Sequence, residues 1–212
     1  MFKTLINKIK STTGNSLAEF AVTTAMMATL AATAAPQFGS VGEGAKEKKT
    51  MNNIDKIIQS ANNFYNQKLD EEGRGRFPGQ SKYDSKVGGY DLPADTETDI
   101  ALEIFTETIL NNYDGYTDDL SSFVYVFAQS ADDQDAIQGD WHSLESSVVY
   151  DVDGAVDFVG LFANNGMASP FQDGAYIYLV IPGSGSGSSS QAPALIVADA
   201  ENPTELHKTL VP

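Results

Sequence analysis

The N-terminal stretch KIKSTTG (residues 8–14), followed by NSLAEFAVTTAMMATLAATAAPQF (residues 15–38), decides the fold of this chain. An apolar run extends from Leu17 to Ala35 and holds one charged side chain, Glu19. A helix over this run reaches roughly 28 Å at ~1.5 Å per residue, which is about the thickness of the hydrocarbon core of a bilayer. The sequence therefore predicts a helix that anchors the protein in a membrane.

Residues 1–14 are typical of a targeting segment, because they carry Lys3, Lys8 and Lys10 and no acid. A secretory signal peptide places its apolar core ahead of the cleavage point. Here the long apolar run begins at Leu17, after the expected processing point at Gly14. The apolar run is therefore predicted to stay in the mature protein.

The apolar run is rich in alanine and threonine, which makes it a weak membrane span by hydropathy. Small residues let helices approach one another closely, and threonine hydroxyls can bond back to the backbone of their own helix. This composition favours a helix that leaves the lipid for a bundle of like helices.

Glu19 has two interpretations. A carboxylate inside an apolar run costs on the order of a few kcal/mol at mid-bilayer and less near the interface. Its side chain either reaches the lipid headgroups or meets a cation in an assembled state. The natural cation is a newly exposed α-amino group on a neighbouring copy, and such a pair would set the axial register between subunits.

These residues together resemble the class III signal and first helix of type IV pilins and type II secretion pseudopilins. Gly14, Glu19 and Pro36–Gln37–Phe38 fall in the family's register without a gap. The resemblance implies cleavage between Gly14 and Asn15 by a prepilin peptidase, which also methylates the new N-terminus. It further implies assembly into a helical filament by an inner-membrane machine.

Two features depart from the family pattern. Asn15 stands where the family usually has an aromatic residue. Threonines replace bulky aliphatic residues at four positions of the run, Thr23, Thr24, Thr29 and Thr33. These departures leave the subfamily open.

The segment Ala35–Gly44 contains the residues that most weaken a helix, Pro36 and the glycines at 39, 42 and 44. It is expected either to be a loop between two helices or to be a hinge that extends as subunits pack. Residues Ala45–Leu69 are expected to be an amphipathic helix, because apolar residues recur there every three or four positions. That stripe comprises Met51, Ile54, Ile58, Ala61, Tyr65 and Leu69, widened by Ile57 and Phe64.

Residues Glu71–Asp95 are rich in glycine, proline and charge, which predicts a long exposed connection. Its basic side chains either contact an acidic face of a neighbouring subunit or are simply solvated. These side chains are Arg74, Arg76, Lys82 and Lys86.

The rest of the chain predicts one helix and then a sheet. Thr96–Asn112 has helical spacing, with Asp95 or Thr96 as its cap and a stripe of Ile100, Ile104, Phe105, Ile109 and Leu110. After Gly115 the period changes to two, and an antiparallel sheet of four to six strands is expected. The expected strands are Ser121–Gln129, Ser147–Asp151, Ala155–Phe162, Ala175–Ile181 and Ala194–Ala198, with a hairpin turn at Asp153–Gly154 and a flexible loop at Gly183–Ser190.

The predicted fold class is α+β, a long N-terminal α-helix packed on an antiparallel β-sheet globular domain, as the resemblance to type IV pilins implies. The chain is predicted to divide into a cleaved leader (1–14), a hydrophobic transmembrane and filament-core helix (15–36), a hinge with an amphipathic helix (37–69), and a globular α+β head (70–212).

Charge and composition exclude several functions. The 212 residues carry a net charge of −16, and the 198 residues after the leader hold 10 basic and 29 acidic residues, a net of −19. Such a body repels nucleic acid, so no nucleic-acid partner is expected. The chain has no cysteine, which excludes disulfides and thiolate metal sites.

Catalysis and metal binding have few candidates. The two histidines are His142 and His207, and the sequence holds no nucleophile motif or phosphate loop, so an enzyme is not expected. The pattern D-x-D-G-x-x-D at Asp151, Asp153 and Asp157 is a weak candidate for calcium, and acidic turns offer the plainer explanation. A second acidic cluster comprises Asp132, Asp133, Asp135 and Asp140.

Two classes of function compete. The first is a structural subunit of an extracellular type IV pilus-like filament, made in the inner membrane and then displayed at the bacterial cell surface. A major pilin-like subunit is favoured within this class, with a pseudopilin or minor pilin as the alternative. The second class is a membrane-tethered or secreted binding protein or hydrolase. Cleavage at Asn15 would favour the first class, and cleavage near Ala35 would favour the second.

Overall fold

The structure is a computed structural model that describes residues 2–88, 97–113, 123–128, 141, 155–163, 165–172, 174–185, 187 and 190–212. Within it, side chains are described except at 2–16, 33–40 and 112. The chain forms two compact units, Met1–Ala45 and Lys46–Pro212.

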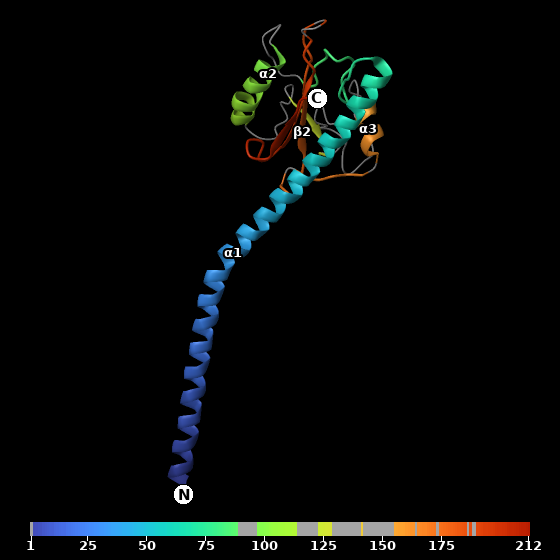
Figure 1. Ribbon diagram of the computed structural model, residues 1–212. Helices are drawn as coiled ribbons and strands as arrows, with labels where there is room; N and C mark the ends of the chain where they lie inside the picture. The colour runs from blue at the N-terminus through green and yellow to red at the C-terminus, as the bar shows by residue number, and fades with distance from the viewer. Residues whose placement is uncertain are drawn as a thin grey trace, which may run out of the picture. The chain divides into compact units, whose positions relative to one another are not determined.

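Helix α1 spans 71 residues, Phe2–Glu72, and Figure 1 shows it as one unbroken ribbon. The helix continues through Pro36 and through the glycines that follow, so the expected loop between two helices is wrong. A proline removes one amide donor from a helix, and an interior glycine costs only about 1 kcal/mol relative to alanine. The remaining hydrogen bonds of a long helix offset these local losses.

From Thr50 onward α1 buries the predicted amphipathic stripe. Ile54 and Ile57 are 0% exposed, and Ala61, Phe64 and Tyr65 are also buried. Met51 and Ile58 pack partly against the same core. The prediction of an amphipathic helix is confirmed, although its last apolar residue, Leu69, is 42% exposed.

The described residues contain one four-stranded antiparallel sheet in the order β1-β2-β3-β4. Strand β1 is Val124–Val126, β2 is Tyr176–Ile181, β3 is Ala194–Asp199 and β4 is His207–Leu210. Tyr178 lies at the centre, paired with Val124 on one side and Val197 on the other. The expected α+β class, with an antiparallel sheet, is confirmed.

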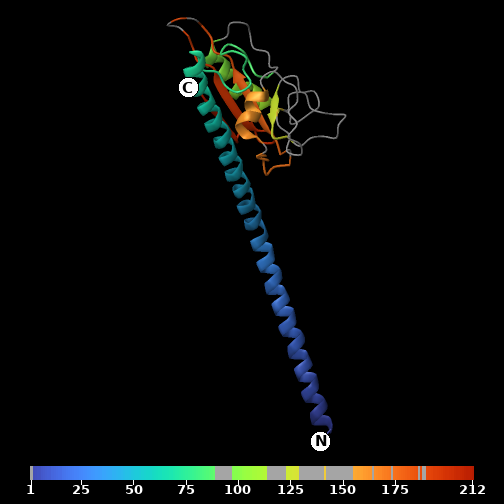
Figure 2. The same ribbon diagram turned by 90° about the vertical axis from the view of Figure 1, so that its right-hand side faces the viewer.

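Alternate residues of the central strands face two hydrophobic layers. Tyr176, Tyr178 and Val180 face the layer formed by α1 and by α3, Ala155–Phe162. Ile177 and Leu179 face the layer formed by α2, Thr98–Ile104, and the π-helical turn η1, Phe105–Ile109. In Figures 1 and 2, α2 accordingly lies on the opposite side of the sheet from the cyan-green end of α1.

The segment Ala155–Phe162 is a helix, so its prediction as a strand is wrong. Ala155, Phe158 and Phe162 are buried at spacings of three and four, which is helical periodicity. Phe158 and Phe162 stack with centroids 4.6 Å apart on this face. Its content of valine and phenylalanine is typical of a strand, but the spacing of its buried residues is helical. The proposed hairpin therefore lacks its second strand, and its turn at Asp153–Gly154 and its first strand at Ser147–Asp151 lie outside the described residues.

The helical prediction for Thr96–Asn112 is confirmed for Thr98 onward, where α2 and η1 are followed by a 3₁₀ turn, η2, at Leu110–Asn112. Ala101, Phe105 and Leu110 are buried, whereas Ile100 is 49% exposed. The predicted stripe is therefore wrong at Ile100. The proposed caps, Asp95 and Thr96, lie outside the described residues.

The connection after α1 is not exposed throughout, which corrects another expectation. Phe77 is 0% exposed and packs on the Tyr65 ring with centroids 5.2 Å apart. Gly79 adopts φ +90°, and a Cβ there would lie 1.8 Å from the Trp141 ring. Residues 75–80 therefore form part of the core, since only glycine admits the indole at this point.

A buried polar cluster joins α1 to the sheet. The Ser169 hydroxyl donates to the Asp199 carboxylate at 2.5 Å and lies 3.5 Å from the Thr50 hydroxyl. The Asn53 amide donates to the Tyr176 hydroxyl at 2.9 Å. Burial raises the pKa of the Asp199 carboxyl above its ordinary value, against hydrogen bonds that lower it, and burial raises the pKa of Tyr176 to about 12.

Candidate functional site

All four residues predicted for processing and assembly lie on α1, within the first compact unit. Gly14 and Asn15 are helical and lie one turn ahead of Glu19. Pro36 lies further along the same helix. Asn15 and Glu19 are therefore about one helical turn apart, whereas Pro36 lies several turns further along α1.

The residues of α1 from 17 to 32, the apolar segment, are all exposed. The large apolar side chains among them expose between 53% and 71% of their surface. These side chains are Leu17, Phe20, Val22, Met26, Met27 and Leu30. Ile54 and Ile57 on the same helix are fully buried, so among the described residues the apolar segment has no comparable cover.

The apolar segment has no polar side. Phe20 and Met27 are seven residues apart and share one side of the helix, while Met26 and Leu30 lie on another. An amphipathic surface helix shows apolar residues on one stripe only, whereas a helix that is apolar all round is buried on every side. The segment therefore fits surroundings that cover it on every side better than a single flat surface.

The threonine hydroxyls of the apolar segment donate hydrogen bonds to backbone carbonyls of the same helix. Thr23 donates to the carbonyl oxygens of Glu19 and Phe20 at 3.0 and 2.9 Å. Thr24 donates to the Phe20 carbonyl at 2.7 Å, and Thr29 to the Met26 carbonyl at 2.9 Å. These bonds pair the hydroxyl donors within the helix, so the segment can enter an apolar environment without unpaired hydroxyl donors.

Glu19 is the single charge of the apolar segment. Its side chain is exposed and forms no ion pair within the described part of the chain. It lies three residues before Val22 and seven before Met26, so it shares their side of the helix. Any partner that covers this apolar side must also accommodate a carboxylate.

The candidate calcium ligands are not brought together in the described residues. The Asp157 carboxylate accepts a bond of 2.6 Å from the Arg76 guanidinium, and these side chains are 24% and 13% exposed. Asp151 and Asp153 lie outside the described residues, as do the four acids of the second cluster. No group of three or more potential metal ligands occurs among the residues described. A calcium site at Asp151, Asp153 and Asp157 stays a prediction.

Arg76, one of the four basic side chains expected to be exposed on the connection after α1, is bound within the head. Besides Asp157 it binds Glu72 at 3.2 Å and donates to the Gln80 carbonyl at 2.9 Å, so it serves the interior of its own head. Arg74 lies over the Tyr83 ring, 4.2 Å from its centroid. Lys82 and Lys86 remain exposed.

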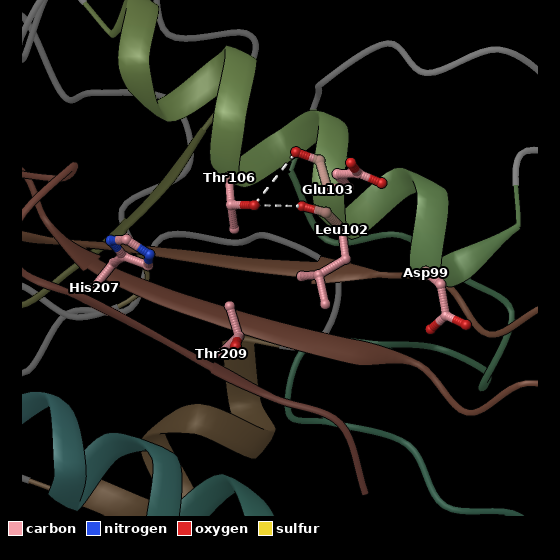
Figure 3. Close-up of a pocket in the computed structure, with 6 residues that line it drawn as sticks. All are labelled: Asp99, Leu102, Glu103, Thr106, His207 and Thr209. Atoms are coloured by element: carbon pink, nitrogen blue, oxygen red, sulfur yellow. Dashed lines mark hydrogen bonds between the residues drawn. The ribbon is translucent and has the colours of Figure 1, made fainter.

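A cleft that the sequence did not reveal lies between α2 and the edge strand β4, with a volume of about 410 Å³. Three residues of α2 border it, Asp99, Leu102 and Glu103. Thr106 borders it from η1, and His207 and Thr209 border it from β4. Figure 3 shows Leu102 and Thr106 projecting from the helix toward this strand. His207 lies on the β4 side of the cleft, at the opposite end from Asp99 in Figure 3, and His142 lies outside the described residues. The sequence HKTL of β4 lacks a strand's apolar alternation, which is why β4 was missed.

No family model, curated protein or solved structure matches this chain. Within the described part of the chain, no helix combines the length and the apolar character required to cross a membrane.

Proposed function

We propose that this chain is a structural subunit of an extracellular filament of the type IV pilus kind, most simply a major pilin-like subunit. Its apolar segment packs against the same segment of neighbouring copies. The precursor is held in the inner membrane, cleaved by a prepilin peptidase between Gly14 and Asn15, and then drawn into the filament by an inner-membrane assembly machine. The head, from Lys46 onward, is what the filament displays.

One observation carries the proposal. Residues 17–32 expose apolar side chains on all sides of a helix, while the second unit buries its own core completely at residues such as Ile57 and Tyr178. A complete head with an uncovered apolar helix needs cover from outside the chain. Copies of the same helix supply that cover, and small residues allow the helices to approach closely.

Glu19 gives the packing its register in this proposal. Its carboxylate has no partner among the described side chains and shares a side with Val22 and Met26. In a bundle of copies the new α-amino group of Asn15 from a neighbour is the cation that neutralises it. An unpaired carboxylate in that environment costs on the order of a few kcal/mol, so only one axial stagger is favourable.

The primary test is the N-terminus of the mature protein, measured by mass spectrometry on surface filaments sheared from cells. The proposal expects filaments built from this chain, beginning at Asn15 with a methylated amine. A mature chain that begins near Ala35 and diffuses as a soluble monomer would contradict it and favour a secreted binding protein or hydrolase.

The second test replaces Glu19 by alanine. Glu19→Ala should leave the protein stable in the membrane fraction and reduce surface filaments at least tenfold, because the register contact is lost. Glu43→Ala is the matched control, since Glu43 is another exposed acid on the same helix beyond the apolar segment. Normal filaments from Glu19→Ala would refute the role given to this carboxylate.

A further inference from the structure

The head carries two unpaired surfaces of opposite charge. The first runs along the outward side of α1, where exposed residues recur at spacings of three and four without a single acid. This basic stripe comprises Lys46, Lys49, Asn52, Lys56, Gln59 and Asn63. Two acids occur in this part of α1, Glu47 and Asp55. Asp55 borders the stripe, three residues after Asn52, and is bound to Lys208.

The cations of the basic stripe are available to a partner. Lys49 and Lys56 form no ion pair in the part of the chain that the structure describes. Lys46 lies over the Phe171 ring, 5.7 Å from its centroid, and forms no ion pair with a described side chain. On a body with a net charge of −19 after the leader, uncompensated lysines in a row are a distinct local feature.

The second surface is the cleft between α2 and β4. Asp99 and Glu103 border it, and neither carboxylate has a salt bridge or hydrogen bond among the described residues. Leu102 supplies an apolar contact, and Thr106, His207 and Thr209 complete the lining (Figure 3). Carboxylates beside an apolar wall suit the ammonium group and the long methylene stem of a lysine.

The two surfaces lie on opposite faces of the head. The basic stripe belongs to α1, which covers one face of the sheet with α3. The cleft belongs to α2, which covers the other face, as Figures 1 and 2 show. Different patches on opposite faces make a heterologous contact, which generates an open helical filament when the rotation between copies does not close a ring.

From this arrangement we infer that the α2–β4 cleft of one head receives the basic stripe of a second copy of this chain, so that head-to-head contacts reinforce the helix bundle of the filament. The inference rests on the proposed function and adds to it the surfaces by which the heads recognise one another. Opposite charges at such a contact select the partner and its orientation, and their attraction weakens as salt is added.

Charge reversal tests the inference in cells that make the full chain as its sole copy. Lys49→Glu with Lys56→Glu makes the stripe acidic, and Asp99→Lys with Glu103→Lys makes the cleft basic. Each double variant should lower the amount of sheared filament about threefold to tenfold, because like charges now face one another. The quadruple variant restores opposite charges, and it should recover most of the wild-type amount.

Matched controls change the net charge equally at other exposed sites. Lys48→Glu with Lys82→Glu corresponds to the stripe variant, and Glu47→Lys with Glu107→Lys corresponds to the cleft variant. Both should give wild-type amounts of filament. Thermal unfolding of detergent-extracted protein verifies that each variant has a folded head. Wild-type filaments should also dissociate more readily in high salt than in low salt.

The outcomes separate the two proposals. If wild-type filaments form and the folded double variants assemble normally, or if the quadruple variant assembles as poorly as the doubles, the inference is overturned and the filament proposal stands. If the wild-type chain forms no filament at all, both proposals are overturned. Loss in both doubles with recovery in the quadruple variant and normal controls supports the contact.

Discussion

The two parts of α1 carry similar apolar side chains in opposite circumstances. Between Ile54 and Tyr65 the apolar residues lie on one stripe and are buried against strands of the same chain. Between Leu17 and Leu30 they lie on all sides and are exposed. Both parts are helical, so helix propensity does not explain why one is buried and the other exposed. The difference is that strands and helices of the head pack against the part between Ile54 and Tyr65. One part stabilises the head, and the other is free to stabilise an assembly.

The largest expected effect comes from shortening a side chain in each part. Ile57→Ala removes buried methyl groups and should destabilise the head by about 2–5 kcal/mol. Met27→Ala, at a position that is 71% exposed, should leave the head's thermal unfolding unchanged. Circular dichroism of detergent-extracted protein measures both. Equal destabilisation by the two variants would show that the parts are not energetically distinct.

The two parts also differ in how their charged side chains are paired. In the head Arg76 pairs with Asp157, whereas Glu19 has no partner among the described side chains. Arg76→Met leaves the Asp157 carboxylate, only 24% exposed, without its cation. The head should lose about 1–3 kcal/mol of its free energy of unfolding in urea. Arg74→Met is the control, and its exposed contact with the Tyr83 ring is expected to contribute about 0.5–1 kcal/mol or less. An Arg76→Met variant as stable as Arg74→Met would be evidence against an internal role.

The smallest effect concerns the polar cluster where α1 meets the sheet. Because the pKa of Asp199 is raised in the folded head, folding disfavours its ionised form. The wild-type head should therefore gain stability relative to Asp199→Asn as the pH falls from neutral through the raised pKa, and the gain is complete below the ordinary value. Denaturant unfolding of both proteins across this range measures the difference. A difference that stays constant with pH, or shrinks as the pH falls, would refute the prediction.

Much of the fold could be predicted from periodicity. The stripe of α1, the strands β2 and β3, and the helical segment from Thr98 follow repeats of apolar residues, and each is confirmed. The prediction for Ala155–Phe162 is wrong because its apolar residues, interrupted by Asp157 and Gly160, fit either period. Only its neighbours in space, such as Phe127 against Phe162 with centroids 5.4 Å apart, favour the helix.

The remaining features depend on contacts between distant residues. Phe77 and Gly79 lie in a stretch with the composition of a loop, and their burial depends on Tyr65 and Trp141. The α2–β4 cleft likewise joins residues about a hundred positions apart, and no local pattern connects them. The apolar segment was predictable because its signal is contained in consecutive residues.

The buried stripe of α1 meets its partners late in the chain. Asn53 bonds to Tyr176, which is 123 residues further on, and Asp55 pairs with Lys208, which is 153 residues further on. During synthesis the apolar segment is therefore complete long before the head can close. A chain that is released midway through synthesis therefore exposes the stripe that should lie under the sheet, and an exposed apolar stripe is prone to aggregate.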